Sequence, residues 1–135
     1  MSQQMIFVNL PVTDLDASKR FFTELGYSID ARFSNEDAAS VVISDTIVAM
    51  LLTRPFYATF TKKEIADATT TSEVLICLSA DSREKVDELV GKALAAGGTE
   101  SRPAQDRGFM YGRSFDDLDG HTWEIVWMDP AAIEG

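Results

Sequence analysis

The sequence predicts an α+β fold in which two βαβββ units form a cupped mixed sheet with the helices on its outer face. The order strand, helix, three strands occurs twice, over about residues 5–53 and again over about residues 73–128. In both halves an amphipathic helical period follows the first strand directly. Such a repeat implies two equivalent sheets, each covered by a helix on one face. We therefore expect residues 1–135 to form a single domain, whose units are joined by an excursion at 54–72.

The first unit opens with an alternating strand and an amphipathic helix. In Met5–Val12 the even-numbered apolar residues share one face, and Phe7 and Asn9 point the other way. Thr13 and Asp14 offer an N-cap, and Gly26 marks the end of the helix. Three further strands are expected at 27–33, 39–44 and 46–53.

The second unit repeats this order. A strand at Glu73–Ala80 places Leu75 and Cys77 on one face, and Asp81 with Glu84 forms a capping box for the helix that follows. The helical period runs to Gly97, and further strands are expected at 99–102, 109–116 and 121–128. The excursion at 54–72 lacks a long period, so we expect a surface segment with one helical turn, placed at or near a contact with another chain.

Composition narrows the class of protein. The chain has 12 Lys and Arg against 22 Asp and Glu, a formal net charge of −10. Nucleic acids and anionic membranes need clustered basic residues, so neither is an expected partner, whereas a neutral or cationic small molecule is. The single cysteine, Cys77, excludes an internal disulfide and a multi-cysteine zinc site. The first residues resemble no signal peptide and no apolar run has the length of a membrane span, so we expect a cytoplasmic protein.

The closing hairpin carries the most informative polar residue. Glu124 lies in the middle of the last strand, on the face opposite Trp123. Two registers of the hairpin are open. If Phe115 pairs with Trp123, Ser114 lies across from Glu124, which we favour because the aromatic residues then match. A shift of one residue brings Arg113 across from Glu124 instead.

Two stretches resemble a known family. LPVTDLDASKRFFTELGY, residues 10–27, is similar to the first strand and helix of the vicinal-oxygen-chelate superfamily, the glyoxalase, bleomycin-resistance and extradiol-dioxygenase group. LDGHTWEIVW, residues 118–127, resembles the closing hairpin of that group. The resemblance extends over residues 5–130 and implies the fold, together with a homodimer. It does not select a reaction, because the family contains lyases, dioxygenases, epimerases, thiol transferases and proteins that only sequester drugs.

The resemblance also indicates where a metal would bind. Metal-dependent members hold a divalent ion with His, Gln or Glu side chains, and the matching positions here are Phe7, Leu51, Leu75 and Glu124. Only Glu124 has a donor atom, and a divalent ion needs several nitrogen or oxygen ligands. We therefore expect no metal and no other cofactor, and an apolar centre of the cavity.

Two other residues suggest chemistry without establishing it. His121, the only histidine, precedes the last strand and alternates with Trp123, so we interpret it as a structural residue of the hairpin. Cys77 would be a nucleophile only if a cation lowered the pKa of its thiol, and no cation is expected nearby. A buried, inert thiol is the favoured interpretation.

Two functions remain open at this point. The first is a metal-independent small-molecule binding protein of the sequestration or resistance type. The alternative is a lyase, isomerase or dioxygenase-like enzyme that acts on a small carbonyl or oxygenated compound with Glu124 as the base. Arg113 beside Glu124 would favour the enzyme, because a lone base cannot stabilise an enolate, whereas Ser114 there would favour the binder. The expected ligand-binding residues are Phe7, Asn9, Leu51, Leu75, Cys77, Ser114 and Glu124, with Arg113 as the alternative.

Overall fold

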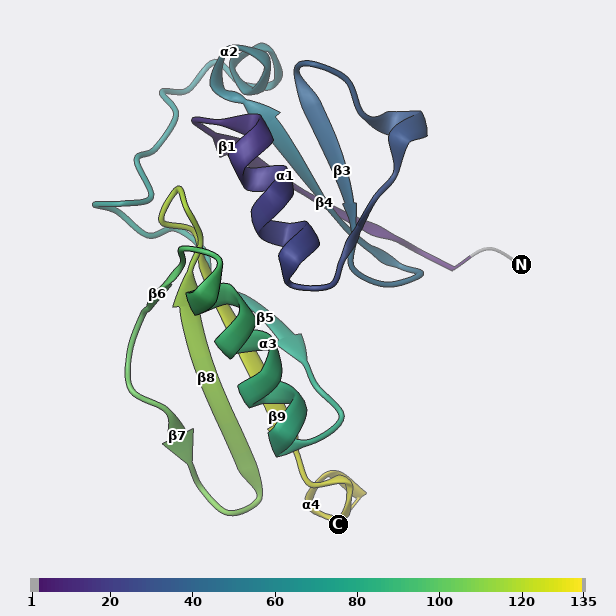
Figure 1. Cartoon of the computed structure of the whole chain (residues 1–135), viewed down its shortest axis with the longest axis vertical. Coiled ribbons are helices and arrows are strands. Elements are labelled where there is room, and N and C mark those ends of the chain that lie inside the picture. The colour runs from purple at the N-terminus through teal and green to yellow at the C-terminus, as the bar shows by residue number, and fades with distance from the viewer. Residues whose placement is uncertain (1–2, 135) are drawn as a thin grey trace. The chain divides into compact units, whose positions relative to one another are not determined.

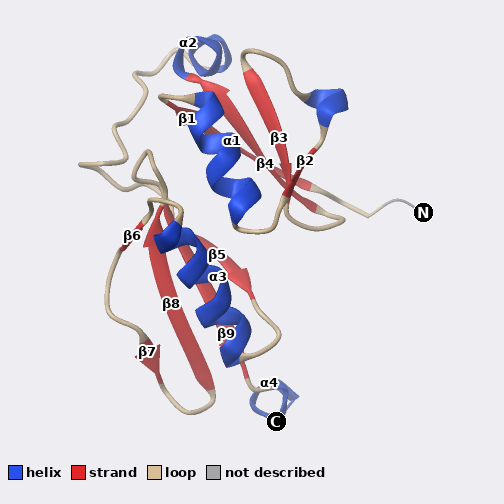
Figure 2. Ribbon diagram, in the orientation of Figure 1, coloured by secondary structure: helices blue, strands red, loops and turns tan. Residues whose placement is uncertain are grey.

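The computed structural model describes residues 3–134, which form two compact units divided between Ala66 and Asp67. Each unit contains one mixed sheet with an α-helix on it, in the βαβββ order that the sequence predicts (Figures 1 and 2). The α+β fold class is thereby confirmed. None of the described helices is long and apolar enough to cross a membrane.

In the first unit the sheet has the order β1-β4-β3-β2, with β1 parallel to β4 and the other pairs antiparallel. A short α2 and a 3-10 turn η2 follow the last strand, so the excursion begins with the expected helical turn. The elements are β1 Ile6–Val12, α1 Leu15–Glu24, β2 Ser28–Ile29, η1 Ala31–Phe33, β3 Ala38–Val42, β4 Ile47–Thr53, α2 Arg54–Tyr57 and η2 Ala58–Phe60.

In the second unit the sheet has the order β5-β9-β8-β6, and the short β7 also pairs with β8. Strand β5 is parallel to β9, and β8 and β9 form the closing hairpin. The elements are β5 Ile76–Ser79, α3 Arg83–Ala95, β6 Thr99–Glu100, β7 Gln105–Asp106, β8 Met110–Asp116, β9 Thr122–Met128 and α4 Pro130–Glu134.

Several predicted elements differ from the structure, and the strand expected at 99–102 ends at Glu100. The expected strand at 27–33 is reduced to β2 and the 3-10 turn η1, because the carboxylate of Asp30 accepts hydrogen bonds from the backbone and side chain of Arg32 and closes a turn. Strand β5 begins at Ile76 rather than at residue 73. The N-cap of α3 is Ser82, whose hydroxyl accepts from the Lys85 N–H, and not Asp81.

The core of the first unit lies between α1 and its sheet. Phe21 and Phe22 of α1 pack edge to face, with ring centroids 5.1 Å apart, and both are buried. The most deeply buried strand residues are Ala39, Val41, Ala49 and Leu51, which share one face with Leu10 and Val12. Figure 1 shows α1 lying along the sheet.

The core of the second unit lies between α3 and the closing hairpin. Phe115 and Trp123 face each other across β8 and β9 and stack with their ring planes 8° apart and their centroids at 6.4 Å. Val86, Val90 and Ala93 of α3 are fully buried. Burial of this much aromatic and aliphatic surface supplies most of the stabilisation of such a unit.

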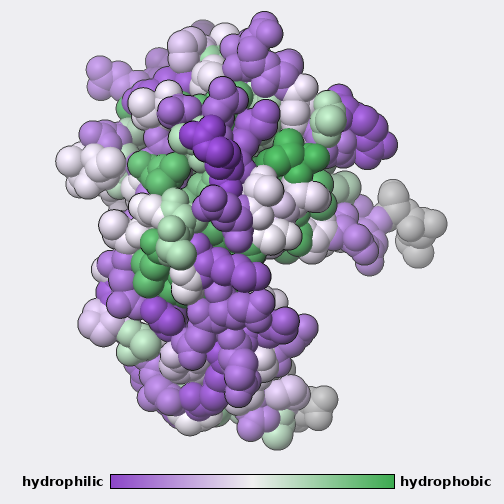
Figure 3. All heavy atoms as spheres, in the orientation of Figure 1, coloured by the Kyte–Doolittle hydropathy of each residue, from purple (hydrophilic) through white to green (hydrophobic). Residues whose placement is uncertain are grey.

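Ion pairs connect α3 to the sheet. The Arg83 guanidinium donates two hydrogen bonds to Asp106 of β7, at 2.7 and 3.0 Å, and lies over the rings of Tyr111 and Trp127. This pair holds the pKa of Asp106 at about 2. Arg113 bonds Asp87 of α3, and hydrophilic residues dominate the surface over this helix in Figure 3.

The turn between β8 and β9 is built on a buried carboxylate. Asp117 accepts hydrogen bonds from the backbone N–H groups of Asp119 and His121 and from the Trp123 indole N–H, each at 3.0 Å. Burial raises the pKa of Asp117. Gly120, with φ of +89°, closes the turn in a conformation that favours glycine. His121 contributes its backbone to this hairpin, as its sequence position indicates.

Candidate functional site

The hairpin register decides which side chains meet on the sheet of the second unit. Ser114 lies across from Glu124 and Phe115 across from Trp123, so the favoured register is confirmed. Arg113 is instead opposite Ile125, and its guanidinium bonds Asp87 of α3 at 3.1 Å. The alternative that placed Arg113 beside Glu124 is therefore wrong, because successive residues of a strand point to opposite faces.

Cys77, Glu124 and Ser114 form a row across three neighbouring strands. Cys77 of β5 is in register with Glu124 of β9, which is in register with Ser114 of β8. Because Arg113 and Tyr111 point to α3, this row lies on the opposite side of the sheet, which we call the helix-free face. A thiol, a carboxylate and a hydroxyl are thus brought side by side, although Cys77 is at least 37 positions away in the chain from both Ser114 and Glu124.

Glu124 has a cationic partner that the sequence did not indicate. Nη2 of Arg102 lies 2.6 Å from Oε2 of Glu124. The Glu124 side chain is 17% exposed and that of Arg102 is 53% exposed. The expectation of a lone carboxylate among apolar residues is therefore wrong, because the irregular segment after β6 turns back over the face and supplies a guanidinium.

A small pocket of about 30 Å³ lies beside this ion pair. It is roughly the space of one water molecule. Its lining is mainly apolar, and Gln105 of β7 is the one uncharged polar side chain there. Around Arg102 and Glu124 it is lined by Pro103, Gln105, Met110, Gly112, Arg113 and Val126.

Ser114 adds an unusual feature to the row. Its hydroxyl is buried and has no hydrogen-bond partner within the part of the chain that the structure describes. Buried hydroxyl groups normally have partners, since an unpaired one costs about 1–3 kcal/mol. Ser114 does not line the pocket beside the ion pair, so its hydroxyl is a buried group of the sheet.

The thiol of Cys77 is exposed, and the expectation that it is buried is wrong. The strand that carries it lies at the edge of the sheet, where no further strand covers it. Partial burial, and then the negative charge of Glu124, raise the pKa of this thiol. The protonated thiol is a poor nucleophile at neutral pH, so the structure favours an inert cysteine.

In the first unit the expected ligand positions divide between two faces. Leu51 is paired with Leu10 and has no exposed surface, so it belongs to the core under α1 and its expected place in a cavity is wrong. Phe7 and Asn9 lie on the other face, where Met50 pairs with Asn9. An alignment displaced by one residue accounts for the error, because it moves a strand residue to the opposite face.

The remaining predicted positions are open to solvent. Phe7 and Leu75 are each more than half exposed, so neither forms an apolar centre within its own unit. The Asn9 side-chain amide donates to the Phe7 carbonyl at 3.5 Å. Phe7 and Leu75 thus provide exposed apolar surface, near the start of β1 and just before β5.

The donor set of this chain does not fit the divalent ion of metal-dependent relatives. Within residues 3–134 no three His, Cys, Asp or Glu side chains gather where they could hold an ion. Phe7, Leu75 and either Leu51 or its neighbour Met50 offer no nitrogen or oxygen donor. The remaining carboxylate, Glu124, is held by Arg102. A divalent ion would need several such ligands at once.

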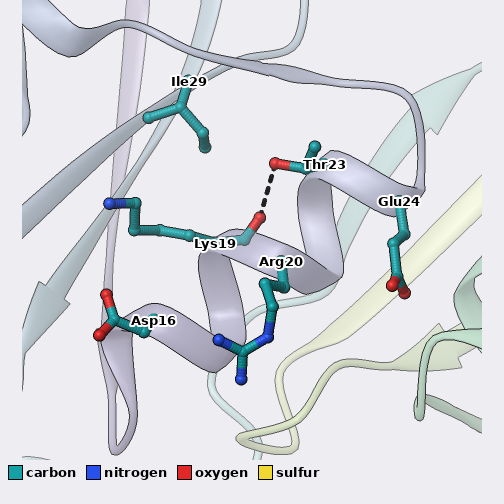
Figure 4. Close-up of a pocket in the computed structure, with 6 residues that line it drawn as sticks. All are labelled: Asp16, Lys19, Arg20, Thr23, Glu24 and Ile29. Atoms are coloured by element: carbon teal, nitrogen blue, oxygen red, sulfur yellow. Dashed lines mark hydrogen bonds between the residues drawn. The ribbon is translucent and has the colours of Figure 1, made fainter.

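A larger hollow lies against the outer side of α1. It is lined by Asp16, Lys19, Arg20, Thr23, Glu24 and Ile29, and Figure 4 shows their charged ends pointing in different directions. The Thr23 hydroxyl donates to the Lys19 carbonyl within the helix at 2.8 Å. Because no polar groups converge on one point, this hollow lacks the features of a specific site.

Comparison with known proteins identifies the family. A family model described as bleomycin resistance protein-like N-terminal matches residues 4–44. A hypothetical protein from S. aureus is 30% identical over 94% of this chain and 95% of its own, with a TM-score of 0.78. A glyoxalase/bleomycin resistance protein/dioxygenase family enzyme from Burkholderia phytofirmans superposes with a TM-score of 0.76 over 93% of this chain and 99% of its own, at 18% identity. The chain belongs to the glyoxalase/bleomycin-resistance/dioxygenase family.

A more distant member shares the fold. The bleomycin resistance determinant encoded on transposon Tn5 is 18% identical, with a TM-score of 0.66 over 94% of this chain and 99% of its own. No curated protein is similar enough in sequence to be matched. Membership of the glyoxalase/bleomycin-resistance/dioxygenase family is consistent with several chemistries, so the function has to be argued from the site itself.

Proposed function

We propose that this protein is a metal-independent small-molecule binding protein of the sequestration or resistance type. The observation that carries the proposal is the Arg102–Glu124 ion pair at the centre of the helix-free face. Of the positions where metal-dependent relatives hold an ion, only Glu124 has a donor atom here. The guanidinium of Arg102 already neutralises that carboxylate. A site without a metal retains the pocket and the polar contacts needed for binding.

The proposed ligand site is centred on the row of Cys77, Glu124 and Ser114, with Gly112 and Gln105 at its border. The Ser114 hydroxyl is buried beneath this face, and the polar groups that line the pocket are those of Arg102, Glu124 and Gln105. The family model and the Tn5 determinant bear names that refer to bleomycin resistance. These names connect relatives of the chain with resistance to a small molecule.

A second candidate is a lyase, isomerase or dioxygenase-like enzyme with Glu124 as general base. The observation that favours it is again Arg102, because a cation beside a base is able to stabilise an oxyanion. Against it, the same guanidinium is engaged by Glu124 itself, so neither group is free for catalysis while the pair is intact. Binding without turnover is therefore the better supported function.

Native mass spectrometry of the protein purified from cells tests the proposal. We expect a small-molecule adduct that is released unchanged in mass. Gly112→Ala should reduce its occupancy several-fold, because the added methyl group lies 3.3 Å from Val126 Cγ2 in the pocket lining. Gly91→Ala on α3, where the new Cβ meets nothing within 4 Å, is the matched control and should leave occupancy unchanged.

Two results contradict the proposal. A protein that carries no adduct, and acquires none from a cell extract, is not a binder of this type. Release of the molecule with a changed mass, abolished by Glu124→Gln, would establish the enzyme instead.

We also propose that the protein is a homodimer and works in the cytoplasm. The strands β1 and β5 are at the edges of their sheets, and Ile6, Phe7, Val74 and Leu75 are exposed apolar residues at or next to these edges. Exposed apolar edges favour pairing with another chain. In the excursion, Phe60 is exposed while its ring packs edge to face on Phe56 at 5.2 Å.

Light scattering coupled to gel filtration should give twice the mass of the 135-residue chain at micromolar concentration. Phe7→Glu should raise the dimer dissociation constant at least tenfold, because it places a charge on apolar contact surface. Glu36→Gln, a change on an exposed loop, serves as a control and should leave the mass unchanged. A wild-type monomer under these conditions would exclude the dimer.

A further inference from the structure

Three arginine side chains that bond residues of the second unit are held very differently. Arg83 donates to Asp106 through two nitrogens, bonds the Gly108 carbonyl at 2.9 Å and lies over two aromatic rings. Arg113 bridges Asp87 and Glu100, at 3.1 and 2.9 Å. Arg102 makes one hydrogen bond, to Glu124, and no other within residues 3–134. It is therefore the arginine that can leave its partner at the smallest cost.

The two members of the Arg102–Glu124 pair also differ in their surroundings. Glu124 is fixed in the middle of β9 and its side chain is 17% exposed. Arg102 belongs to the irregular segment between β6 and β7, and its side chain is 53% exposed. Solvent screens an ion pair in which one partner is half exposed, and this weakens the hold of Glu124 on Arg102. The guanidinium can thus turn into solvent, while the carboxylate remains on the sheet face.

The size of the pocket shows what the ion pair prevents. With Arg102 in place the pocket measures about 30 Å³, which is enough for a water molecule and too small for an organic ligand. Arg102 is itself part of the lining. Its departure opens the space next to Met110, Gly112 and Val126, and leaves the Glu124 carboxylate without a counter-ion.

A carboxylate that has lost its counter-ion on a partly buried face selects for a new cation. An anionic ligand would have to approach Arg102 with Glu124 2.6 Å away and against a net charge of −10, both of which oppose it. A ligand with an amidinium, guanidinium or ammonium group meets neither obstacle. Its apolar body would contact the methionine, glycine and valine of the pocket.

We propose that the Arg102 guanidinium competes with a cationic ligand for the Glu124 carboxylate. In the empty protein Arg102 neutralises Glu124, and the cationic head of a small amphiphilic molecule displaces it. This inference rests on the proposed binding function and assigns the chemical class of the ligand. Arg102 then determines specificity and affinity, since it penalises every ligand that cannot replace its charge at Glu124.

Three probes of the same shape test this exchange: benzamidine, benzamide and benzoate, which are cationic, neutral and anionic. Their dissociation constants are measured by NMR titration, and the rate of Cys77 alkylation by iodoacetamide gives a local readout. Cys77 is the single cysteine and is in register with Glu124. Benzamidine should bind and slow the alkylation, and benzoate should do neither.

The variants separate competition from general charge effects. Arg102→Ala should tighten benzamidine binding about two- to fivefold, which corresponds to loss of a competitor worth up to about 1 kcal/mol. Arg107→Ala removes the same charge from the exposed turn between β7 and β8 and should change the affinity less than 1.5-fold. Glu124→Gln should weaken benzamidine binding at least tenfold without weakening benzamide binding.

The opposite outcomes overturn the inference. Weaker benzamidine binding in Arg102→Ala would make Arg102 a ligand contact, and equal effects of Arg102→Ala and Arg107→Ala would reduce its role to net charge. Benzoate binding that disappears in Arg102→Ala would identify an anion site, and benzamidine that fails to bind the wild type at millimolar concentration would leave the carboxylate without a cationic ligand.

If instead the mass-spectrometric adduct is neutral, this inference fails while the proposed binding function stands. If no adduct forms but the benzamidine exchange holds, the proposed function fails alone.

Discussion

Gly120→Ala should destabilise the protein by about 2–5 kcal/mol. Gly120 has a φ of +89°, in the left-handed region where a side chain is strained. A Cβ added there would also lie 2.8 Å from the backbone carbonyl oxygen of Ala68 and 2.8 Å from the backbone nitrogen of Thr69. These atoms belong to a turn in which the Asp67 side chain bonds Thr69, so they cannot move aside as a flexible side chain would. Backbone strain and overpacking therefore add.

Gly108→Ala separates these two effects. Gly108 has a similar φ of +80°, but a Cβ there meets nothing within 4 Å. It should cost about 1–2 kcal/mol, from backbone strain alone. Urea unfolding of both variants gives the difference, which measures the contact with residues 68–69. Equal losses for the two glycines would show that the turn yields, and that the close approach contributes nothing.

The sequence predicted the fold because its signals are local. The helical periods and the Asp14 cap each follow from residues close together in the chain, and the match of Phe115 with Trp123 predicted the correct hairpin register. Strand β7 was missed because it is only two residues long, Gln105–Asp106, and shows no alternation of apolar and polar residues. It is held by Arg83, 23 positions away from Asp106.

The site was predicted less completely for the same reason. Glu124 was found because a carboxylate in the middle of a strand is exceptional, and Ser114 was placed by the register. Arg102 was missed because a strand was expected to run to residue 102, whereas β6 ends at Glu100 and Arg102 belongs to the irregular segment that follows. A one-residue error in a strand sufficed to place Leu51 on the wrong face.

Asp117→Ala should destabilise the protein by about 2–5 kcal/mol and loosen the strand that carries Glu124. The change removes the acceptor of three hydrogen bonds, including that of the buried indole N–H of Trp123. Each buried donor left without a partner costs about 1–3 kcal/mol. Asp117→Asn keeps the shape and one acceptor oxygen, so its loss should be about half as large.

A double-mutant cycle with Trp123→Phe tests the reason for this loss. The two side chains share a hydrogen bond, so their effects on the free energy of unfolding should fall short of additivity by about 1 kcal/mol or more. Strict additivity would show that Asp117→Ala loses stability only through the hydrogen bonds to backbone N–H groups, and that the indole N–H does not contribute.

The cost of Asp117→Ala should also depend on pH, with a sign that burial determines. Burial raises the pKa of Asp117, so the unfolded chain ionises first as the pH rises. The stability linked to this carboxyl is then fully present below its unfolded pKa and is lost as the pH rises through its folded pKa. Because the other carboxylates titrate in both proteins, the difference in unfolding free energy between wild type and Asp117→Ala isolates Asp117. That difference should be larger at pH 4 than at pH 8, and a larger difference at pH 8 would mean that the three hydrogen bonds outweigh burial and hold the carboxylate ionised.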